Sequence, residues 1–240
     1  MHLDPRFMLE TLVLAFKAAP VTLNITLVSL ALALPAGFML ALGRLYRLRI
    51  VSPLIAVFIS FTRGTPVALQ ILIVYSLLPG LLNAAALKLA LPIKVFELNP
   101  IIYAYTVFTL NASAALAEVF RSALITVDRG QLEAALASGL SPAQSYLRVV
   151  IPQALCAAMP NICTLTINLI KNTSLAFLMT VRDITAEAKI AASYGYQYIE
   201  AYLDIFAVYI VICAAAEWLF RRAEAYVSKW KRTGSHAGNT

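Results

Sequence analysis

Polar side chains interrupt stretches of this sequence that are otherwise apolar, and the chemistry open to them is hydrogen bonding. Thr164 and Asn168 lie four residues apart in one apolar run, so they share a face if that run is a helix. Gln70 and Asn111 each interrupt another run. The other polar residues of this kind are Tyr75, Ser113, Asn161, Thr166, Lys171, Asn172, Thr173 and Ser174. Inside a membrane such groups either face a polar cargo or hold helices together, and the residues alone leave both interpretations open.

Little else in the chain offers reactive chemistry. The two histidines, His2 and His236, lie near opposite ends of the sequence, which argues against a histidine-dependent reaction in the membrane. The three cysteines have no metal-ligand spacing and are typical of small core residues. A phosphate-binding GxxxxGKS/T sequence is missing from the chain, so we do not expect it to hydrolyse ATP. We therefore predict no catalytic site, no metal site and no cofactor bound by this chain.

A polar segment that separates two apolar stretches carries the start and stop signals of a short helix. Asp128 is a good N-cap, and Gln131 three residues later resembles the partner of a capping box. Gly139 can take the left-handed conformation that ends a helix, so the pattern predicts a helix over 129–138. A helix this short is not stable alone in water, so something must hold it. We expect such an element to dock to a cytoplasmic partner, and the alternative is a plain loop packed on its own spans.

A second helix start follows directly. Ser141 is its N-cap, Pro142 stands in the first turn and Gln144 is the capping-box partner. Its apolar positions Tyr146 and Val149 lead into the next apolar stretch. The polar segment, about 122–148, is therefore predicted to be a compact helical element that continues into a membrane span.

Composition places the chain in the membrane class. Of its 240 residues, 61% are hydrophobic and 13% are charged, whereas soluble domains average about 25% charged residues. The formal net charge of +7 is spread over short loops and the C-terminal tail. That distribution suits a membrane protein with basic cytoplasmic loops better than a nucleic-acid-binding protein.

Five apolar stretches are long enough to cross a bilayer as helices, which takes about 20 residues each. They cover roughly 21–42, 53–78, 101–120, 149–170 and 201–220. The second contains Gly64-Thr65-Pro66, so residues 53–63 could form a separate interfacial segment. The sequence thus predicts an all-α integral membrane protein, a single domain over 1–240, with the polar segment between its third and fourth spans.

Lysine and arginine in short loops mark the cytoplasmic side of a membrane protein. They gather after the first span, around the polar segment and after the fifth span: Arg44, Arg47, Arg49, Arg121, Arg129, Arg148, Arg221, Arg222, Lys229, Lys231 and Arg232. On the other side the basic residues are spread over longer stretches. This bias predicts an N-terminus outside the cell, with the C-terminus and residues 122–148 in the cytoplasm.

Three motifs in order resemble the permease subunits of ABC importers. Glu133-Ala134-Ala135, three residues, Gly139, nine residues and Val149-x-Ile151-Pro152 resemble the EAA motif, although the family usually has Ile and Leu where this chain has Val149 and Ile151. Arg63-Gly64-Thr65-Pro66 with Gln70, and Lys171-Asn172-Thr173-Ser174-Leu175, are similar to segments of the polar amino-acid permeases, the histidine, glutamine, arginine and cystine uptake group. The resemblance covers essentially the whole chain.

The resemblance implies a transport subunit of the bacterial inner membrane rather than an enzyme. Two permease subunits, identical or similar, would pair in the lipid, two separate ATP-binding subunits would carry ATP and Mg, and an extracytoplasmic amino-acid-binding protein would deliver the cargo. The residues that couple to the ATP-binding subunit would be Glu133, Ala134, Ala135, Gly139 and Pro152. The cargo path would involve Gln70, Asn111, Thr164, Asn168, Asn172, Thr173 and Ser174.

Cargo charge follows from where acidic residues are missing. The stretch 149–170 contains no Asp or Glu, and a cationic side chain that leaves water needs a carboxylate partner. We therefore expect a neutral polar amino acid or cystine as the cargo.

The alternative to an ABC importer is a secondary transporter or a channel without an ATPase. A secondary transporter should show an internal repeat and a buried charge relay, and the sequence displays neither.

Overall fold

The computed structural model describes residues 3–236, with the side chains of residues 3–225, and every regular element in this part of the chain is helical. The long helices are α1 (Pro5–Leu45), α3 (Val67–Lys88), α4 (Ile101–Thr126), α7 (Ile151–Asn172) and α9 (Tyr198–His236). The short ones are α2 (Val51–Gly64), α5 (Arg129–Ala137), α6 (Pro142–Ser145) and α8 (Ile184–Gly195). A π-helical turn, η2 (Tyr146–Val150), and two 3-10 turns, η1 (Val95–Glu97) and η3 (Thr173–Met179), complete the path.

The predicted all-α membrane fold is confirmed. Four helical segments in the described residues are long and apolar enough to cross a bilayer: Pro5–Leu45, Val67–Lys88, Pro142–Met179 and Tyr198–Ala225. Helix α4 passes the same test together with α5, from which it is bent by 64°. Four to five candidate spans therefore agree with the five that the sequence predicts.

Small residues bring α1 and α4 into close contact. Ala33, Gly37 and Ala41 follow one another at intervals of four on α1 and are buried. A Cβ atom on Gly37 would stand 2.6 Å from the Leu116 Cβ of α4, so only glycine permits this approach. Around the crossing lies the main core, which also takes in Phe120 and residues of α7. The α1–α4 pair is thus a frame for the helices around it.

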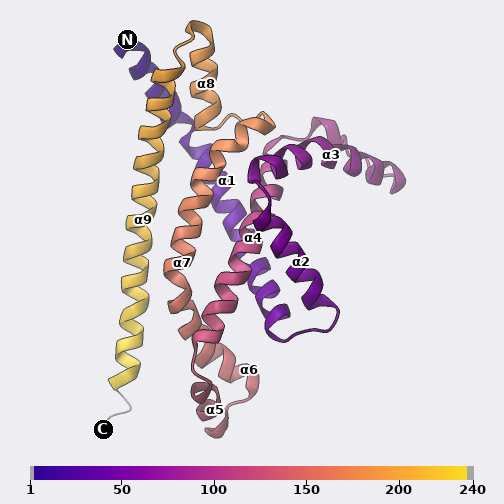
Figure 1. Cartoon of the computed structure of the whole chain (residues 1–240), viewed down its shortest axis with the longest axis vertical. Coiled ribbons are helices and arrows are strands. Elements are labelled where there is room, and N and C mark those ends of the chain that lie inside the picture. Colours follow the sequence, from indigo (N-terminus) through magenta and orange to yellow (C-terminus); the bar gives the residue numbers. More distant parts are fainter. Residues whose placement is uncertain (1–2, 237–240) are drawn as a thin grey trace.

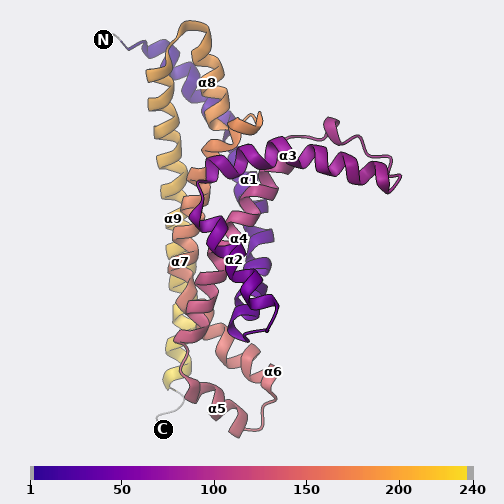
Figure 2. The same ribbon diagram turned by 45° about the vertical axis from the view of Figure 1, so that its right-hand side comes forward.

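The second predicted span is not one helix. It divides into α2 and α3 at Thr65–Pro66, where Thr65 is extended with φ −116° and ψ 147°. Proline causes the break because it lacks a backbone N–H and disfavours helical geometry in the residue before it. Helix α2 stands beside α1 and α4, whereas α3 runs across the long axis of the molecule (Figures 1 and 2).

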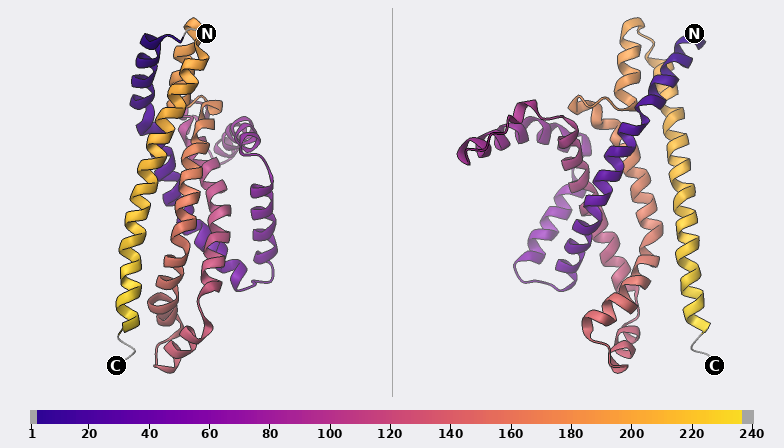
Figure 3. Two further views of the ribbon diagram at one scale, coloured as in Figure 1. Left: turned by 60° about the vertical axis from the view of Figure 1, so that its left-hand side comes forward. Right: turned by 180° about the vertical axis from the view of Figure 1, so that it is seen from behind.

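The molecule has two distinct ends. At one end lie the start of α1, helix α8 and the start of α9, and at the other lie α5, α6 and the far end of α9 (Figure 3). Helix α8 is an element that the five-span prediction lacks. It packs against α1 and α9 after the chain leaves α7 through η3.

Candidate functional site

A polar pocket of about 410 Å³ opens between α4 and α7, with one residue contributed by α2. It contains four of the predicted path residues, namely Asn111, Thr164, Asn168 and Asn172. Its remaining polar lining consists of Arg63, Glu118 and Asn161. The structure therefore brings residues from three helices to one place, which spacing along the sequence could not establish.

The helical repeat of α7 explains why its polar residues converge. Asn161, Thr164, Asn168 and Asn172 follow at intervals of three or four and so form one stripe on the helix, which faces the pocket. Thr166 lies off this stripe. It is buried, and its hydroxyl donates to the carbonyl oxygen of Ile162 at 2.8 Å. Thr166 is therefore part of the helix packing and not of the pocket.

The other three predicted path residues lie outside the pocket lining. The Gln70 amide donates to the Thr62 and Thr65 carbonyl oxygens at 2.7 and 3.1 Å, so this side chain spans the break between α2 and α3. It also accepts from the Asn111 amide at 3.4 Å, which links it to the pocket edge. Thr173 is buried and donates to the Ile170 carbonyl oxygen, and Ser174 is half-buried in η3.

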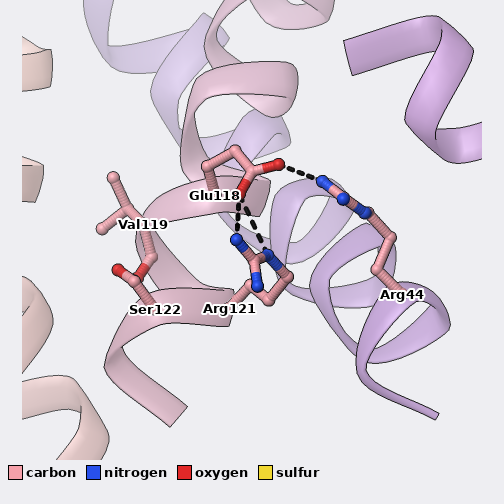
Figure 4. A network of polar contacts seen from close by, with 5 residues as sticks. All are labelled: Arg44, Glu118, Val119, Arg121 and Ser122. Carbon is pink, nitrogen blue, oxygen red and sulfur yellow. Dashed lines mark hydrogen bonds and ion pairs between the residues drawn. The ribbon is translucent and has the colours of Figure 1, made fainter. Parts of the chain in front are cut away.

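Two charged residues of the pocket, Arg63 and Glu118, were not among the predicted site residues. Glu118 forms ion pairs with Arg44 of α1 and with Arg121, whose Nη2 lies 2.9 Å from Glu118 Oε2 (Figure 4). Arg63 makes no ion pair among the described residues. Glu118 is thus paired with two guanidinium groups, while the Arg63 guanidinium in the same pocket lining has no carboxylate partner within the described part of the chain. Charge within an apolar stretch was the signal in the sequence, and Arg121 is three residues from Glu118, but the partner on α1, Arg44, is 74 residues away and could not be found from spacing.

The polar segment forms the helix that the sequence predicts. Helix α5 begins where the Asp128 carboxylate accepts from the Gly130 N–H at 2.6 Å, and it ends within one residue of the predicted boundary. Gly139 has a φ of +86°. The Leu140 N–H reaches the Ala135 carbonyl at 3.2 Å and the Gly139 N–H reaches Leu136 at 3.0 Å, which is the Schellman pattern of a glycine-terminated helix.

The second capping signal is also confirmed, with one correction to the first. Ser141 and Gln144 form a complete capping box at the start of α6. Gln131, however, does not act as a box partner, because its side-chain oxygen accepts from the Gln153 amide at 3.4 Å. That bond ties α5 to α7. The π-helical turn η2 then joins α6 to α7 without a break, so the polar segment and α7 are mechanically connected.

The residues of the EAA-like motif divide into an exposed and a buried set. Glu133, Ala134, Gly139 and Pro152 are exposed, and Ala135 is buried. Glu133 forms no side-chain hydrogen bond or ion pair within the described part of the chain. An exposed carboxylate on a small-residue helix, at one end of the molecule, suits contact with a basic surface.

Comparison with known proteins gives consistent similarities. Residues 33–229 match the family model described as "binding-protein-dependent transport system inner membrane component". The chain is 37% identical over 210 residues to the L-cystine transport system permease protein TcyL of Bacillus subtilis (strain 168), covering 88% of this chain and 85% of that protein. It is 32% identical to the probable amino-acid ABC transporter permease protein PatM of Vibrio harveyi, covering 95% and 98%.

Solved structures share the fold. A crystal structure of an amino acid ABC transporter with histidines matches with a TM-score of 0.78 and 25% identity, covering 94% of this chain and 100% of the other. The MetNI methionine ABC transporter in an inward-facing conformation matches with a TM-score of 0.61 at 17% identity, covering 92% and 94%, which is a likeness of fold alone. The helical arrangement is therefore one already known among membrane proteins.

Proposed function

The chain belongs to the family of binding-protein-dependent transport system inner membrane components, and on that premise we propose that its α4–α7 pocket lies on the path of an imported amino acid. The protein is the inner-membrane permease of an ABC importer and not its ATPase. A component of this kind works with a binding protein and an ATPase. Its relatives are named as transporters of amino acids, L-cystine among them. Amino-acid uptake is the function of this permease.

The observation that supports the path is the convergence of hydrogen-bonding groups from α4 and α7 on one pocket. Replacement of Asn168 by leucine removes both a donor and an acceptor at similar volume. We expect the initial rate of uptake to fall about 3- to 10-fold, the equivalent of one lost hydrogen bond. Thr166→Val on the same helix is the matched control, because Thr166 faces the packing and not the pocket. An equal fall in the initial rate of uptake in both variants would show that the pocket does not lie on the cargo path.

Pocket charge supports a cargo without net positive charge. Arg63 is free to meet a cargo carboxylate, and the only acidic lining residue, Glu118, is already bound to two arginines. A cationic side chain would find no uncommitted carboxylate there. We expect cystine or a neutral polar amino acid to be transported in preference to arginine or lysine. The test measures uptake of labelled cystine with and without an excess of arginine, and uptake of labelled arginine by itself. The expectation would be contradicted if arginine abolished cystine uptake and were itself transported faster than cystine.

The same premise extends to the partners. We expect two ATP-binding subunits, which bind ATP and Mg, a second permease subunit, identical or similar, and an extracytoplasmic amino-acid-binding protein. Exposed apolar residues on α3, among them Leu69, Ile73 and Leu77, are consistent with a face that meets a second permease or lipid. The coupling surface on this chain would comprise Glu133, Ala134, Ala135, Gly139 and Pro152.

Orientation is part of the proposal. The basic loop after α1, the polar segment and the far end of α9 would lie in the cytoplasm, and the N-terminus and α8 outside. Support comes from the arrangement of α5 and α6 at the end of the molecule opposite to α8 (Figure 1). Arg44 and Arg121 lie on the α5 side of the bundle, in agreement with the preference of arginine for the cytoplasmic side.

A further inference from the structure

The segment that follows α7 keeps its backbone in an uncommon conformation. It is η3 (Thr173–Met179), a 3-10 helix of seven residues, whereas 3-10 runs longer than three or four residues are uncommon. Thr180 ends this helix with φ 58° and ψ 16°, which is left-handed geometry. Glycine is the usual residue at such a position, and a β-branched residue there is strained. The surrounding structure must therefore hold this segment in place.

Packing and a hydrogen bond to α3 hold η3. Its Ala176 and Met179 side chains are fully buried, and η3 contacts α3, α4 and α8. The Thr180 hydroxyl lies 3.2 Å from the hydroxyl of Tyr75 on α3, which is a hydrogen bond between helices distant in the sequence. Tyr75 is positioned by Tyr103 of α4, because their rings meet edge to face with centres 5.8 Å apart. Helices α3 and α4 therefore both act on the end of η3.

The position of η3 relates it to the α4–α7 pocket. Asn172, the last residue of α7, lines the pocket, and η3 begins at the next residue. From there the chain leaves the axis of α7 toward α3 before it turns to α8 (Figures 1 and 2). The pocket residues Glu118 and Asn161 lie further along α4 and α7 in the direction of α5. The hydrogen bond between Tyr75 and Thr180 thus ties α3 to the segment at the α8 end of the pocket.

We propose that η3 is the outer closure of the pocket and that the hydrogen bond between Tyr75 and Thr180 keeps it closed. The proposal rests on the function proposed above, in which the pocket lies on the path of the amino acid and α8 lies outside the cell. Cargo that enters from the α8 side passes η3 to reach the pocket. The hydrogen bond favours the closed conformation, whereas the strain at Thr180 favours opening. Because the two oppose each other, a small change in free energy is sufficient to open the pocket.

Access to the pocket from outside tests this closure without a transport assay. In a variant without the three native cysteines, Ala115→Cys places a thiol in the pocket lining. The rate of its reaction with an impermeant thiol reagent is measured in intact cells that contain the complete transporter and are depleted of ATP. Tyr75→Phe and Thr180→Val each remove one hydroxyl of the hydrogen bond at nearly unchanged volume. We expect each of them to raise the rate about 2- to 10-fold, the equivalent of one hydrogen bond.

Two further variants separate the hydrogen bond from a general loosening of the structure. Tyr103→Phe removes a hydroxyl that donates to the Val95 carbonyl oxygen at 3.4 Å and leaves the ring beside Tyr75 in place. It should leave the reaction rate unchanged. Thr180→Ser keeps the hydroxyl and removes the β-branch, so it should not raise the rate above that of the wild type.

A rate that rises in only one of Tyr75→Phe and Thr180→Val, or in neither, would overturn the closure. An equal rise in Tyr103→Phe would overturn it as well. The reaction rate does not depend on whether the pocket carries cargo, so this result is independent of the uptake comparison that tests the proposed function. In the same cells, Tyr194→Cys on α8 should react with the reagent. A cysteine at position 194 that does not react would place η3 on the inner side and so refute an outer closure.

Discussion

At the residue scale, Gly139 shows how one backbone angle can decide a functional surface. Its φ of +86° lies where residues with a Cβ are strained, and no atom stands within 4 Å of the position a Cβ would take. The strain of a substitution is therefore purely conformational. Left-handed geometry costs an L-residue about 1–2 kcal/mol, and asparagine tolerates it better than other side chains.

We predict a graded series at this position. Gly139→Asn should retain most transport, Gly139→Ala should lose part, and Gly139→Val should abolish it, because the β-branched side chain shifts the turn that ends α5. Uptake into proteoliposomes and co-purification of the ATP-binding subunit give the measurement. Loss of uptake in the asparagine variant as complete as in the valine variant would mean that side-chain size, and not backbone geometry, matters here.

Glu118 offers a second test at this scale because it joins α1 to α4. Its side chain is 22% exposed and that of Arg44 is 26% exposed, so the pair is largely removed from solvent. Glu118→Gln leaves two partly buried guanidinium groups without a carboxylate. We expect a loss of about 1–3 kcal/mol in the free energy of unfolding, the usual result of leaving a buried polar group unpaired. Thermal unfolding in detergent measures it.

One control variant and one double-mutant cycle test whether the Glu118 ion pair causes this loss of stability. Lys94 and Glu97 form an exposed ion pair, so Glu97→Gln should change stability little. In a double-mutant cycle, Arg44→Gln combined with Glu118→Gln should cost less than the sum of the single changes, because each removes the same interaction. Strict additivity would show that the two side chains do not act together.

Residue chemistry was predictable from the sequence where the signal is local. The caps at Asp128 and Ser141, the glycine stop and the shared face of Thr164 and Asn168 all follow from spacing within one helix. Arg63 and Glu118 escaped because their importance depends on contacts between helices distant in the sequence. Gln70 was predicted to line the cargo path, and its hydrogen bonds to Thr62 and Thr65 place it at a helix break outside the lining of the α4–α7 pocket.

At the element scale, helix packing depends on small residues more than on hydrophobic bulk. Lipid is as apolar as leucine, so close approach and van der Waals contact hold membrane helices together. Helices α1 and α4 meet this requirement through Gly37, whose added Cβ would lie 2.6 Å from the Leu116 Cβ and 3.1 Å from the Ser113 carbonyl oxygen. Both neighbours are close to rigid backbone and cannot move aside.

Glycine-to-alanine changes along the bundle should therefore differ in a set order. Gly37→Ala should destabilise most, because α1 must move away from α4. Gly43→Ala meets only the flexible end of Ile55 and should cost less. Gly80→Ala has open space around it and should be neutral or slightly stabilising, since alanine is the better helix former. Unfolding midpoints in detergent give the order, and a Gly37 variant as stable as the Gly80 variant would contradict the packing model.

Elements were predicted best where pattern and length agree. The long apolar stretches became α1, α4, α7 and α9, and Pro66 had marked the second stretch as interrupted. The direction of α3 and the presence of α8 could not be predicted from the sequence. An apolar helix can span the bilayer, run across the long axis of the helix bundle or pack on the outer end of the bundle. Contacts with other helices decide between these possibilities, and they are not encoded in any single stretch.

At the scale of the whole molecule, the separation of α8 from α5 predicts which residues face which side. In a variant free of Cys156, Cys163 and Cys213, we expect Tyr194→Cys to react with an impermeant thiol reagent in intact cells. Tyr194 is 86% exposed and lies in α8. Gly130→Cys in α5 should react only after the membrane is opened. Reaction of the cysteine at position 130 in intact cells would invert the proposed orientation.

Transport requires that the two ends of the molecule communicate, and α7 is the element that connects them. The N-terminal end of α7 is connected to α5 by η2 and α6 along the chain and by the Gln131–Gln153 hydrogen bond. The polar stripe of α7 lines the pocket. Movement of α5 by a partner would therefore act on the pocket through a continuous helix. Exposed Glu133 is the residue through which we expect that partner to act.

The most direct measurement is ATP hydrolysis by the complete transporter in proteoliposomes, with and without cargo-loaded binding protein, for the wild type and Glu133→Ala. Glu133 is exposed and its side chain forms no hydrogen bond or ion pair in the described residues, so the variant should insert and fold normally. At an interface, loss of one charge of a buried pair costs about 2–5 kcal/mol. We predict that cargo stimulates hydrolysis in the wild type, and that Glu133→Ala loses both this stimulation and uptake. Wild-type stimulation and uptake in the variant would contradict the coupling role of α5.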